Sequence, residues 1–309
     1  MSLLGLTPAL TGTAPFGSCY QQAAANLASW KGLGHAAETL CTTWGFSWDG
    51  GPALDGSGRW SAAAAAVHRM DLADRTYDSW DAAEDAERAS LAAGHPVAAA
   101  VDAFHLPSPY EGREHIAHCV LLLAHEGDRV WISDPMNRPE PTAYPAEAWR
   151  RMRSAEAAGS HRTLLLTSGP RHRATAPELA AAVREDARVH RDADRAAFEG
   201  YLAAREAEAA EGAEVLDVGG VAAERLYLGQ LFRHLAGPAH SVEEAAAVAE
   251  GFTSLSRRWY LLHTLSRESG GGATGRSRLL RMLADLGDRE ARLTAAVDAL
   301  ASALTAQAR

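Results

Sequence analysis

One cysteine, one histidine and one aspartate are spaced along the chain like the parts of a cysteine-dependent acyl-transfer site. Cys19 stands where an irregular segment meets an alanine-rich, helix-like run. His118 lies in an apolar, strand-like run, and Asp134 follows the next such run. Residues in the order Cys, His, Asp, distant in sequence, meet in the fold of enzymes whose thiolate attacks an acyl carbon. The pattern therefore predicts acyl transfer through a thioester.

Each of the three residues has a defined task in that chemistry. A helix N-terminus favours the thiolate of Cys19 and supplies backbone N–H donors for an oxyanion. His118 would share the proton of Cys19 and exchange it with the second substrate. Asp134, one strand away, would hold the other imidazole nitrogen and fix its tautomer. Taken singly, a cysteine in an apolar segment, a strand histidine and an Asp-Pro turn are ordinary structural features, so the ordered set carries the hypothesis.

The other two cysteines are expected to be structural. Cys41 has apolar neighbours in a predicted helix, which suggests packing. Cys119 adjoins His118 on a strand and should face the opposite side, because strand side chains alternate. By the same rule His115 should point away from His118. A zinc site built from His115, His118 and Cys119 is therefore poorly arranged, and we expect no metal.

Composition narrows the class of protein. The chain has 309 residues, which as a prior indicates about two domains, and 47% of them are hydrophobic. A net charge of −9 argues against a nucleic-acid or membrane-surface partner. No apolar run reaches the roughly 18 residues of a membrane-spanning helix. The N-terminus lacks the features of a signal peptide, and three cysteines form no even disulfide set, so we expect a cytoplasmic location.

Periodicity and turn residues predict an α+β fold followed by helices. Ser18 should cap a helix that runs from Cys19 to about Lys31. Further elements are expected as helices at 35–43, 60–72 and 79–93, and as strands at 97–101, 115–124, 129–133 and 164–166. Beyond them only helical period is found, at about 177–211, 217–236, 241–268 and 276–307. The run at 168–170 marks the boundary between domains 1–168 and 169–309.

Two features suggest contacts to substrate. Trp44, Phe46 and Trp48 lie in a loop that is unusually aromatic. They are expected to wall a pocket that keeps water from an acyl-enzyme, with ordinary core packing as the alternative. Asp102 ends a buried strand, where it would bind a cationic amine or a sugar hydroxyl, or else cap a turn.

The residues together resemble the butirosin-H-like N-terminal domain, a branch of the C39-peptidase-like, papain-type cysteine fold. The matching pieces occur in the family's order over roughly residues 16–150. They are Ser18-Cys19-Tyr20-x-x-Ala23-x-Ala25-Asn26, Gly45-Phe46-x-Trp48, Val101-Asp102-x-Phe104-x-Leu106-Pro107 with Tyr110, His115-x-x-His118 and Ile132-x-Asp134.

This resemblance implies an amide-forming acyltransferase of antibiotic biosynthesis. Such enzymes take an aminoacyl group from the phosphopantetheine thioester of an acyl or peptidyl carrier protein and pass it to an amine. The carrier brings the phosphopantetheine arm, so no cofactor of the chain's own is expected. Within the family, the condensation enzymes of lincosamide biosynthesis join a carrier-bound, proline-type amino acid to an aminosugar. Their chain length and two-part layout fit this sequence.

One departure keeps other classes open. Papain-like peptidases place a glutamine six residues before the nucleophile, where this chain has Thr13. Gln21 and Gln22 follow the cysteine instead, and Gln22 is a candidate substrate contact. A cysteine peptidase or amidase using the same triad, and a catalytically inactive binding module, are the alternatives.

The sequence says less about partners. Arginine clusters are candidate contacts to an acidic carrier, although such clusters are often solvated faces. They comprise Arg150, Arg151 and Arg153, then Arg171 and Arg173, and finally Arg257 and Arg258. The acyl group, the amine acceptor and self-association of the chain are left open.

Overall fold

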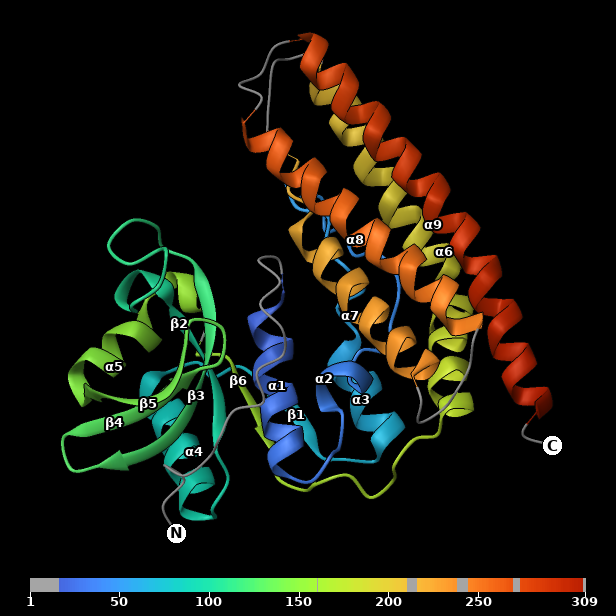
Figure 1. Ribbon diagram of the computed structural model, residues 1–309. Helices are drawn as coiled ribbons and strands as arrows, with labels where there is room; N and C mark the ends of the chain where they lie inside the picture. The colour runs from blue at the N-terminus through green and yellow to red at the C-terminus, as the bar shows by residue number, and fades with distance from the viewer. Residues whose placement is uncertain (1–16, 160, 210–215, 238–243, 269–272, 308–309) are drawn as a thin grey trace. The chain divides into compact units, whose positions relative to one another are not determined.

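The computed structural model describes residues 17–159, 161–209, 216–237, 244–268 and 273–307 (Figure 1). These residues form two compact units. The first comprises the described residues up to Leu40 together with Ala64–Arg173, and the second comprises Cys41–Ala63 together with the described residues from Ala174 onward. The predicted domains, 1–168 and 169–309, differ from these units chiefly in the placement of Cys41–Ala63.

A six-stranded antiparallel sheet is the centre of the first unit. Its strand order is β1-β6-β2-β3-β4-β5. The strands are β1 Leu72–Arg75, β2 Val97–Asp102, β3 Ala117–Glu126, β4 Arg129–Asp134, β5 Arg138–Pro145 and β6 Thr163–Leu166. Every residue of β2 is buried, as expected for a central strand of alanine and valine. The turn between β3 and β4 uses Gly127 at φ +63°, a conformation that glycine adopts without strain.

The sequence pattern predicts neither of the two edge strands, β1 and β5. β1 has only four residues, two of them the charged Asp74 and Arg75. β5 contains Pro139 and Pro141, which cannot donate a ladder hydrogen bond and are tolerated at a sheet edge. The predicted strands near 97–101, 115–124, 129–133 and 164–166 are confirmed.

The early helices and short 3-10 turns precede or connect the strands along the chain. They are α1 Cys19–Trp30, α2 Ala36–Thr39, α3 Trp60–His68, α4 Trp80–Ala92, η1 Ala103–His105, α5 Ala146–Ser154 and η2 Glu156–Ala158. Trp149 and Met152 of α5 pack on Val120 and Leu122 of β3, with residues of α4 beside them. Figure 1 shows α4 and α5 on one face of the sheet and α1 on the other.

Long helices make up most of the second unit. They are α6 Ala176–Ala209, α7 Gly219–Ala236, α8 Glu244–Glu268 and α9 Ala273–Gln307. α6 packs along α9, and α7 along α8, as Figure 1 shows. An antiparallel-sheet region followed by a helical region confirms the predicted α+β class. Within the described ranges, each helix is too short or too polar to cross a lipid bilayer.

Buried hydrogen bonds tie the segment Cys41–Ala63 to the helices. The carboxylate of Glu224, on α7, accepts from the Thr43 hydroxyl at 3.1 Å and from the backbone N–H groups of Gly45 and Ser57 at 3.3 and 3.0 Å. Glu224 is 4% exposed, so these donors compensate for its lost hydration. The prediction of a helix over 35–43, which would include Cys41, is wrong. Helix α2 ends at Thr39, and the residues that follow Cys41 donate hydrogen bonds to Glu224.

Candidate active site

Helix α1 presents Cys19 at its first position, as predicted. Ser18 has extended backbone angles, and its hydroxyl accepts from the N–H of Gln21 at 3.3 Å, which caps the helix start. The Cys19 N–H has no acceptor within the helix, because the first turn always leaves its donors free. The thiol side chain is half-buried, so it is both sheltered and reachable. The residue is therefore placed to attack an acyl group and to hold its oxyanion.

The glutamines that follow Cys19 lie inside α1. Gln21 and Gln22 are both buried, and the backbone carbonyl of Gln22 accepts from the Asn26 side chain at 2.8 Å. The contact of Gln22 with substrate stays a prediction. Thr13, which stands where peptidases have their oxyanion glutamine, lies outside the described residues.

His118 and Asp134 meet at one end of the sheet. His118 is the second residue of β3, and Asp134 is the last residue of the neighbouring β4. Nε2 of His118 lies 3.0 Å from Oδ2 of Asp134, close enough for an ion pair. The Nε2–H group of His118 does not point straight at Oδ2 of Asp134, so the contact is described as an ion pair and not as a well-aligned hydrogen bond.

The Cys19 thiol completes the triad through the same imidazole. Burial by itself would lower the pKa of His118, but the contact with Asp134 and the hydrogen bond with Cys19 outweigh it and raise that pKa to about 10. Since Nε2 faces Asp134, the other ring nitrogen, Nδ1, is left for the sulfur. At neutral pH the ring is an imidazolium between a carboxylate and a nucleophilic sulfur, which is the arrangement that acyl transfer by cysteine needs.

A tight turn holds the Asp134 carboxylate in place. Its Oδ1 accepts from the backbone N–H of Met136 at 3.0 Å and of Asn137 at 3.2 Å. Its Oδ2 accepts from the Asn137 side chain at 2.8 Å. Burial would raise the pKa of Asp134, but His118 and these donors lower it below the usual range. Asn137 was not identified from the sequence, although an Asp-Pro-x-Asn turn of this kind is the signal that could have found it.

Neither of the other cysteines is a competing nucleophile. Cys41 and Cys119 are 2% and 1% exposed. Burial raises the pKa of the Cys41 thiol, and the negative charge of Glu224 adds to the effect. Burial also raises the pKa of the Cys119 thiol well above its ordinary value, with a further contribution from Cys19. Both groups therefore stay as thiols, which are poor nucleophiles.

Asp102 has partners of its own. It is 0% exposed, and its Oδ1 accepts from the Phe104 N–H at 3.0 Å, so it caps the turn η1. Its Oδ2 lies 2.5 Å from Nδ1 of His115. Of the two roles considered for Asp102, turn capping is the one that these bonds display. A direct contact with substrate stays a prediction.

The three aromatic residues of the 44–48 loop pack within the helical unit. The Trp44 indole is 4% exposed and donates to Oε2 of Glu290 at 2.6 Å. The Phe46 ring lies 4.8 Å from the guanidinium of Arg225. Trp48 donates to the Gly51 carbonyl at 2.8 Å. Their packing partners are thus residues of the second unit.

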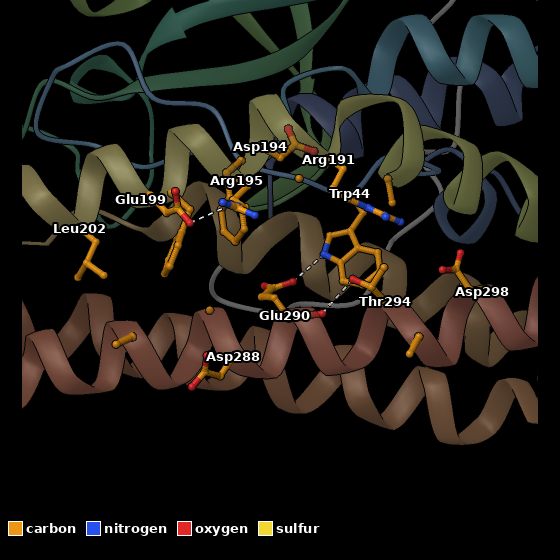
Figure 2. A pocket seen from close by; sticks show the side chains of 18 residues that line it. Trp44, Arg191, Asp194, Arg195, Glu199, Leu202, Asp288, Glu290, Thr294 and Asp298 are labelled. Carbon is orange, nitrogen blue, oxygen red and sulfur yellow. Dashed lines mark hydrogen bonds and ion pairs between the residues drawn. The ribbon is translucent and has the colours of Figure 1, made fainter.

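Trp44 and Phe46 also line a cavity of about 710 Å³ in that unit. Figure 2 shows it between α6 and α9, with the Trp44–Glu290 hydrogen bond in its wall. Its polar and charged lining residues are Arg191, Asp194, Arg195, Glu199, Asp288, Glu290, Thr294 and Asp298. Trp44 and Phe46 therefore line a cavity of the helical unit, and neither Trp48 nor any of Cys19, His118 and Asp134 is among its lining residues. That the three aromatic residues wall an acyl-enzyme pocket stays a prediction.

One proposed carrier contact has to be corrected. Arg153 is 0% exposed and forms an ion pair with Glu87 at 2.8 Å, so it cannot meet a partner protein. Its neighbour Arg150 is exposed, and so are Arg257 and Arg258 on α8. The sequence pattern missed this because the helix α5, which buries one of its faces, was not predicted.

Comparison with known proteins gives a match to a family and a likeness to solved structures. Residues 18–135 match the family described as butirosin biosynthesis protein H, N-terminal. A crystal structure from Bacillus anthracis, described as a C39-like peptidase, aligns with a TM-score of 0.39 and 16% identity over 54% of this chain and 98% of that chain. No curated protein sequence matches the chain.

The matched family span contains all three residues of the triad. Cys19, His118 and Asp134 lie within residues 18–135, and their side chains are in contact. A cysteine at a helix start, hydrogen-bonded to an imidazolium that a carboxylate holds, is the arrangement that cysteine enzymes of the acyltransferase or peptidase type use. Through residues 18–135 the chain is similar to the family described as butirosin biosynthesis protein H, N-terminal.

Proposed function

We propose that the chain is an amide-forming acyltransferase of antibiotic biosynthesis. It takes an aminoacyl group from the phosphopantetheine thioester of a carrier protein, holds it on Cys19 and passes it to an amine acceptor such as an aminosugar. The observation that carries the proposal is the contact of Cys19, at the start of α1, with the protonated ring of His118. Lincosamide assembly, with a proline-type acyl group, is the narrower case that we favour.

The first half-reaction loads the enzyme. The Cys19 thiolate attacks the thioester carbonyl, and a new C–S bond forms. The oxyanion is held by the free N–H at the start of α1. When the intermediate collapses, the original C–S bond breaks and the pantetheine sulfur takes the proton of His118. An acylated Cys19 and a neutral imidazole remain.

The second half-reaction makes the amide. The acceptor amine attacks the acyl carbon of the Cys19 thioester, and a C–N bond forms. His118 takes a proton from the amine nitrogen, and the C–S bond to Cys19 breaks. Its electron pair stays on the sulfur, which restores the thiolate–imidazolium pair. Asp134 stabilises the charge that returns to the ring.

The family match favours a biosynthetic acyl transfer over peptide cleavage. Residues 18–135, which contain Cys19, His118 and Asp134, are similar to a family described as butirosin biosynthesis protein H, N-terminal.

Intact-protein mass spectrometry tests the proposal. The protein is mixed with a panel of aminoacyl-pantetheine thioesters, including the prolyl thioester, and the mass of each acyl group should appear on the wild type. Cys19→Ala should gain no mass, while Cys119→Ala, a matched control for loss of a thiol, should be acylated normally. Adding an amine should then remove the acyl group as an amide. Rapid hydrolysis of simple peptides with no acyl transfer from any thioester would instead favour a cysteine peptidase or amidase.

A further inference from the structure

A second histidine–aspartate pair stands beside the triad. Nδ1 of His115 lies 2.5 Å from Oδ2 of Asp102. The His115 ring stacks on Phe104 with centroids 4.2 Å apart and planes inclined by 9°. The Asp102 side chain is fully buried, whereas that of His115 is 62% exposed. A buried acid thus fixes an imidazole whose other edge is open to solvent.

The strand register places this pair at the same end of the sheet as His118. Asp102 is the last residue of β2 and lies opposite Ala117 of β3. The next pair along the same two strands is Val101 and His118. Directly opposed residues in an antiparallel pair are only about 5 Å apart, so the backbone of Asp102 stands one register step from that of His118, at the same end of the sheet.

The partners of His115 define which nitrogen can accept a proton. Burial would raise the pKa of Asp102, but the bonds from His115 and from the Phe104 N–H lower it below the usual range, so Asp102 is a carboxylate. A carboxylate only accepts, which makes Nδ1 of His115 the donor. Nε2 of the neutral ring then carries the lone pair. A further titratable group near this ring is His105, with centroids 6.3 Å apart.

Proton balance in the amide-forming step calls for such a group. An aliphatic amine is an ammonium ion at neutral pH, as the pKa of about 10.4 for lysine illustrates. An ammonium has no lone pair, so it must lose one proton before it can attack. It loses a second proton as the amide forms, and His118 takes only that one. A second proton acceptor near the triad would raise the fraction of the acceptor that can attack at neutral pH.

We propose that His115, positioned by Asp102, is a second acid–base residue that deprotonates the ammonium form of the acceptor. This inference rests on the proposed acyltransferase function. One N–H bond of the ammonium breaks, its electron pair stays on nitrogen, and the proton goes to Nε2 of His115. The neutral amine then attacks the acyl carbon on Cys19. The exposed ring of His115 returns its proton to solvent.

Two nucleophiles that differ in protonation separate this role from a structural one. The acyl-enzyme is formed with prolyl-pantetheine, freed of small molecules, and then mixed at neutral pH with 6-amino-6-deoxyglucose or with hydroxylamine. The aminosugar is an ammonium ion under these conditions and needs a base, whereas hydroxylamine is already neutral. The variants are His115→Asn and Asp102→Asn. His105→Asn, which removes the exposed neighbouring imidazole, is the matched control.

We expect the rate of acyl transfer to fall only for the nucleophile that is charged at neutral pH. His115→Asn should slow transfer to the aminosugar by about 10-fold or more, and transfer to hydroxylamine by no more than about 2-fold. The defect should shrink at alkaline pH, where the aminosugar loses its proton to water. Asp102→Asn should show a smaller defect of the same kind, because His115 is still present but has lost the carboxylate that positions it. The turn should be kept, because the amide oxygen can still accept from the Phe104 N–H. His105→Asn should behave like the wild type.

Other outcomes would overturn the inference. Equal slowing with both nucleophiles would mean that His115 only supports the structure around it, and no slowing would mean that it has no role. If His115→Asn fails to fold, Asp102→Asn gives the same comparison. If the wild type never becomes acylated, the proposed function fails at the first stage and the inference falls with it. Normal acylation followed by either of the first two outcomes would overturn the inference alone.

Discussion

His118 and Asp134 come from neighbouring strands, and their facing atoms, Nε2 and Oδ2, lie 3.0 Å apart. The two side chains are only 10% and 7% exposed, so water screens their attraction weakly. The pKa of the histidine is raised and that of the aspartate is lowered, and both groups are charged at neutral pH. The protonation of His118 should therefore depend strongly on the charge of Asp134.

Removal of the Asp134 charge should release the His118 proton at lower pH. In Asp134→Asn the largest contribution that raises the pKa of His118 is lost, so the midpoint should fall from about 10 toward neutrality. We expect a decrease of about 1 to 3 units, measured by NMR titration of the His118 ring. Asp102→Asn, whose carboxylate pairs with His115 instead, should leave that midpoint unchanged. An unaltered His118 titration in Asp134→Asn would contradict this reading of the pair.

The same histidine should make the protein less stable at alkaline pH. Its folded-state pKa, about 10, exceeds the ordinary value of 6.5. The stabilisation is therefore fully present below about 6.5 and is lost as pH rises through about 10. The free energy of unfolding should fall over this window by an amount on the order of a few kcal/mol. Urea denaturation at a series of pH values measures it, and His118→Gln should show a flatter profile than the wild type.

Glu290 should be essential to the helical unit. Its carboxylate accepts from the side chains of Trp44, Arg225 and Trp259 at 2.6 to 2.8 Å. Glu290→Ala would leave the fully buried Arg225 short of a partner, which should cost about 3 to 5 kcal/mol of unfolding free energy. The matched control is Asp288→Ala, an exposed position on the same helix, with an expected change within about 0.5 kcal/mol. Equal effects of the two changes in chemical denaturation would refute the network's importance.

Alkylation should distinguish the three thiols. Cys19 is half-buried, whereas Cys41 and Cys119 are enclosed and have raised pKa values. Iodoacetamide under native conditions should therefore label Cys19 alone, as read by peptide mapping. Unfolding in urea should expose all three to the reagent. Labelling of Cys119 in the native protein at the rate of Cys19 would show that the sheet is not closed around it.

The residues of the proposed triad can be picked out from the sequence because each is marked by local signals. A capping serine before Cys19, an apolar strand around His118 and a turn after Asp134 are all visible within a few residues. The start of the strand that carries His118 differs from the prediction. The strand is expected from His115, but β3 begins only at Ala117, so His115 belongs to the preceding connection and reaches Asp102.

Long-range packing was beyond the reach of sequence patterns. Nothing near Trp44 in the chain shows that its indole donates to a carboxylate 246 residues away. The edge strand β5 was hidden by its prolines, and α5 by the absence of a capping side chain, since Pro145 precedes it. In each case the structure is decided by partners that lie far along the chain.

The placement of Cys41–Ala63 with the helices has a consequence for gene construction and for evolution. A chimera joined at residue 169 would combine one protein's Thr43, Trp44 and Ser57 with another protein's counterparts of Glu224 and Glu290. Both of these buried carboxylates would then face foreign donors from the Cys41–Ala63 segment. Helical units could be exchanged between relatives only as two inserts moved together, so recombination at a single crossover should seldom yield a folded hybrid.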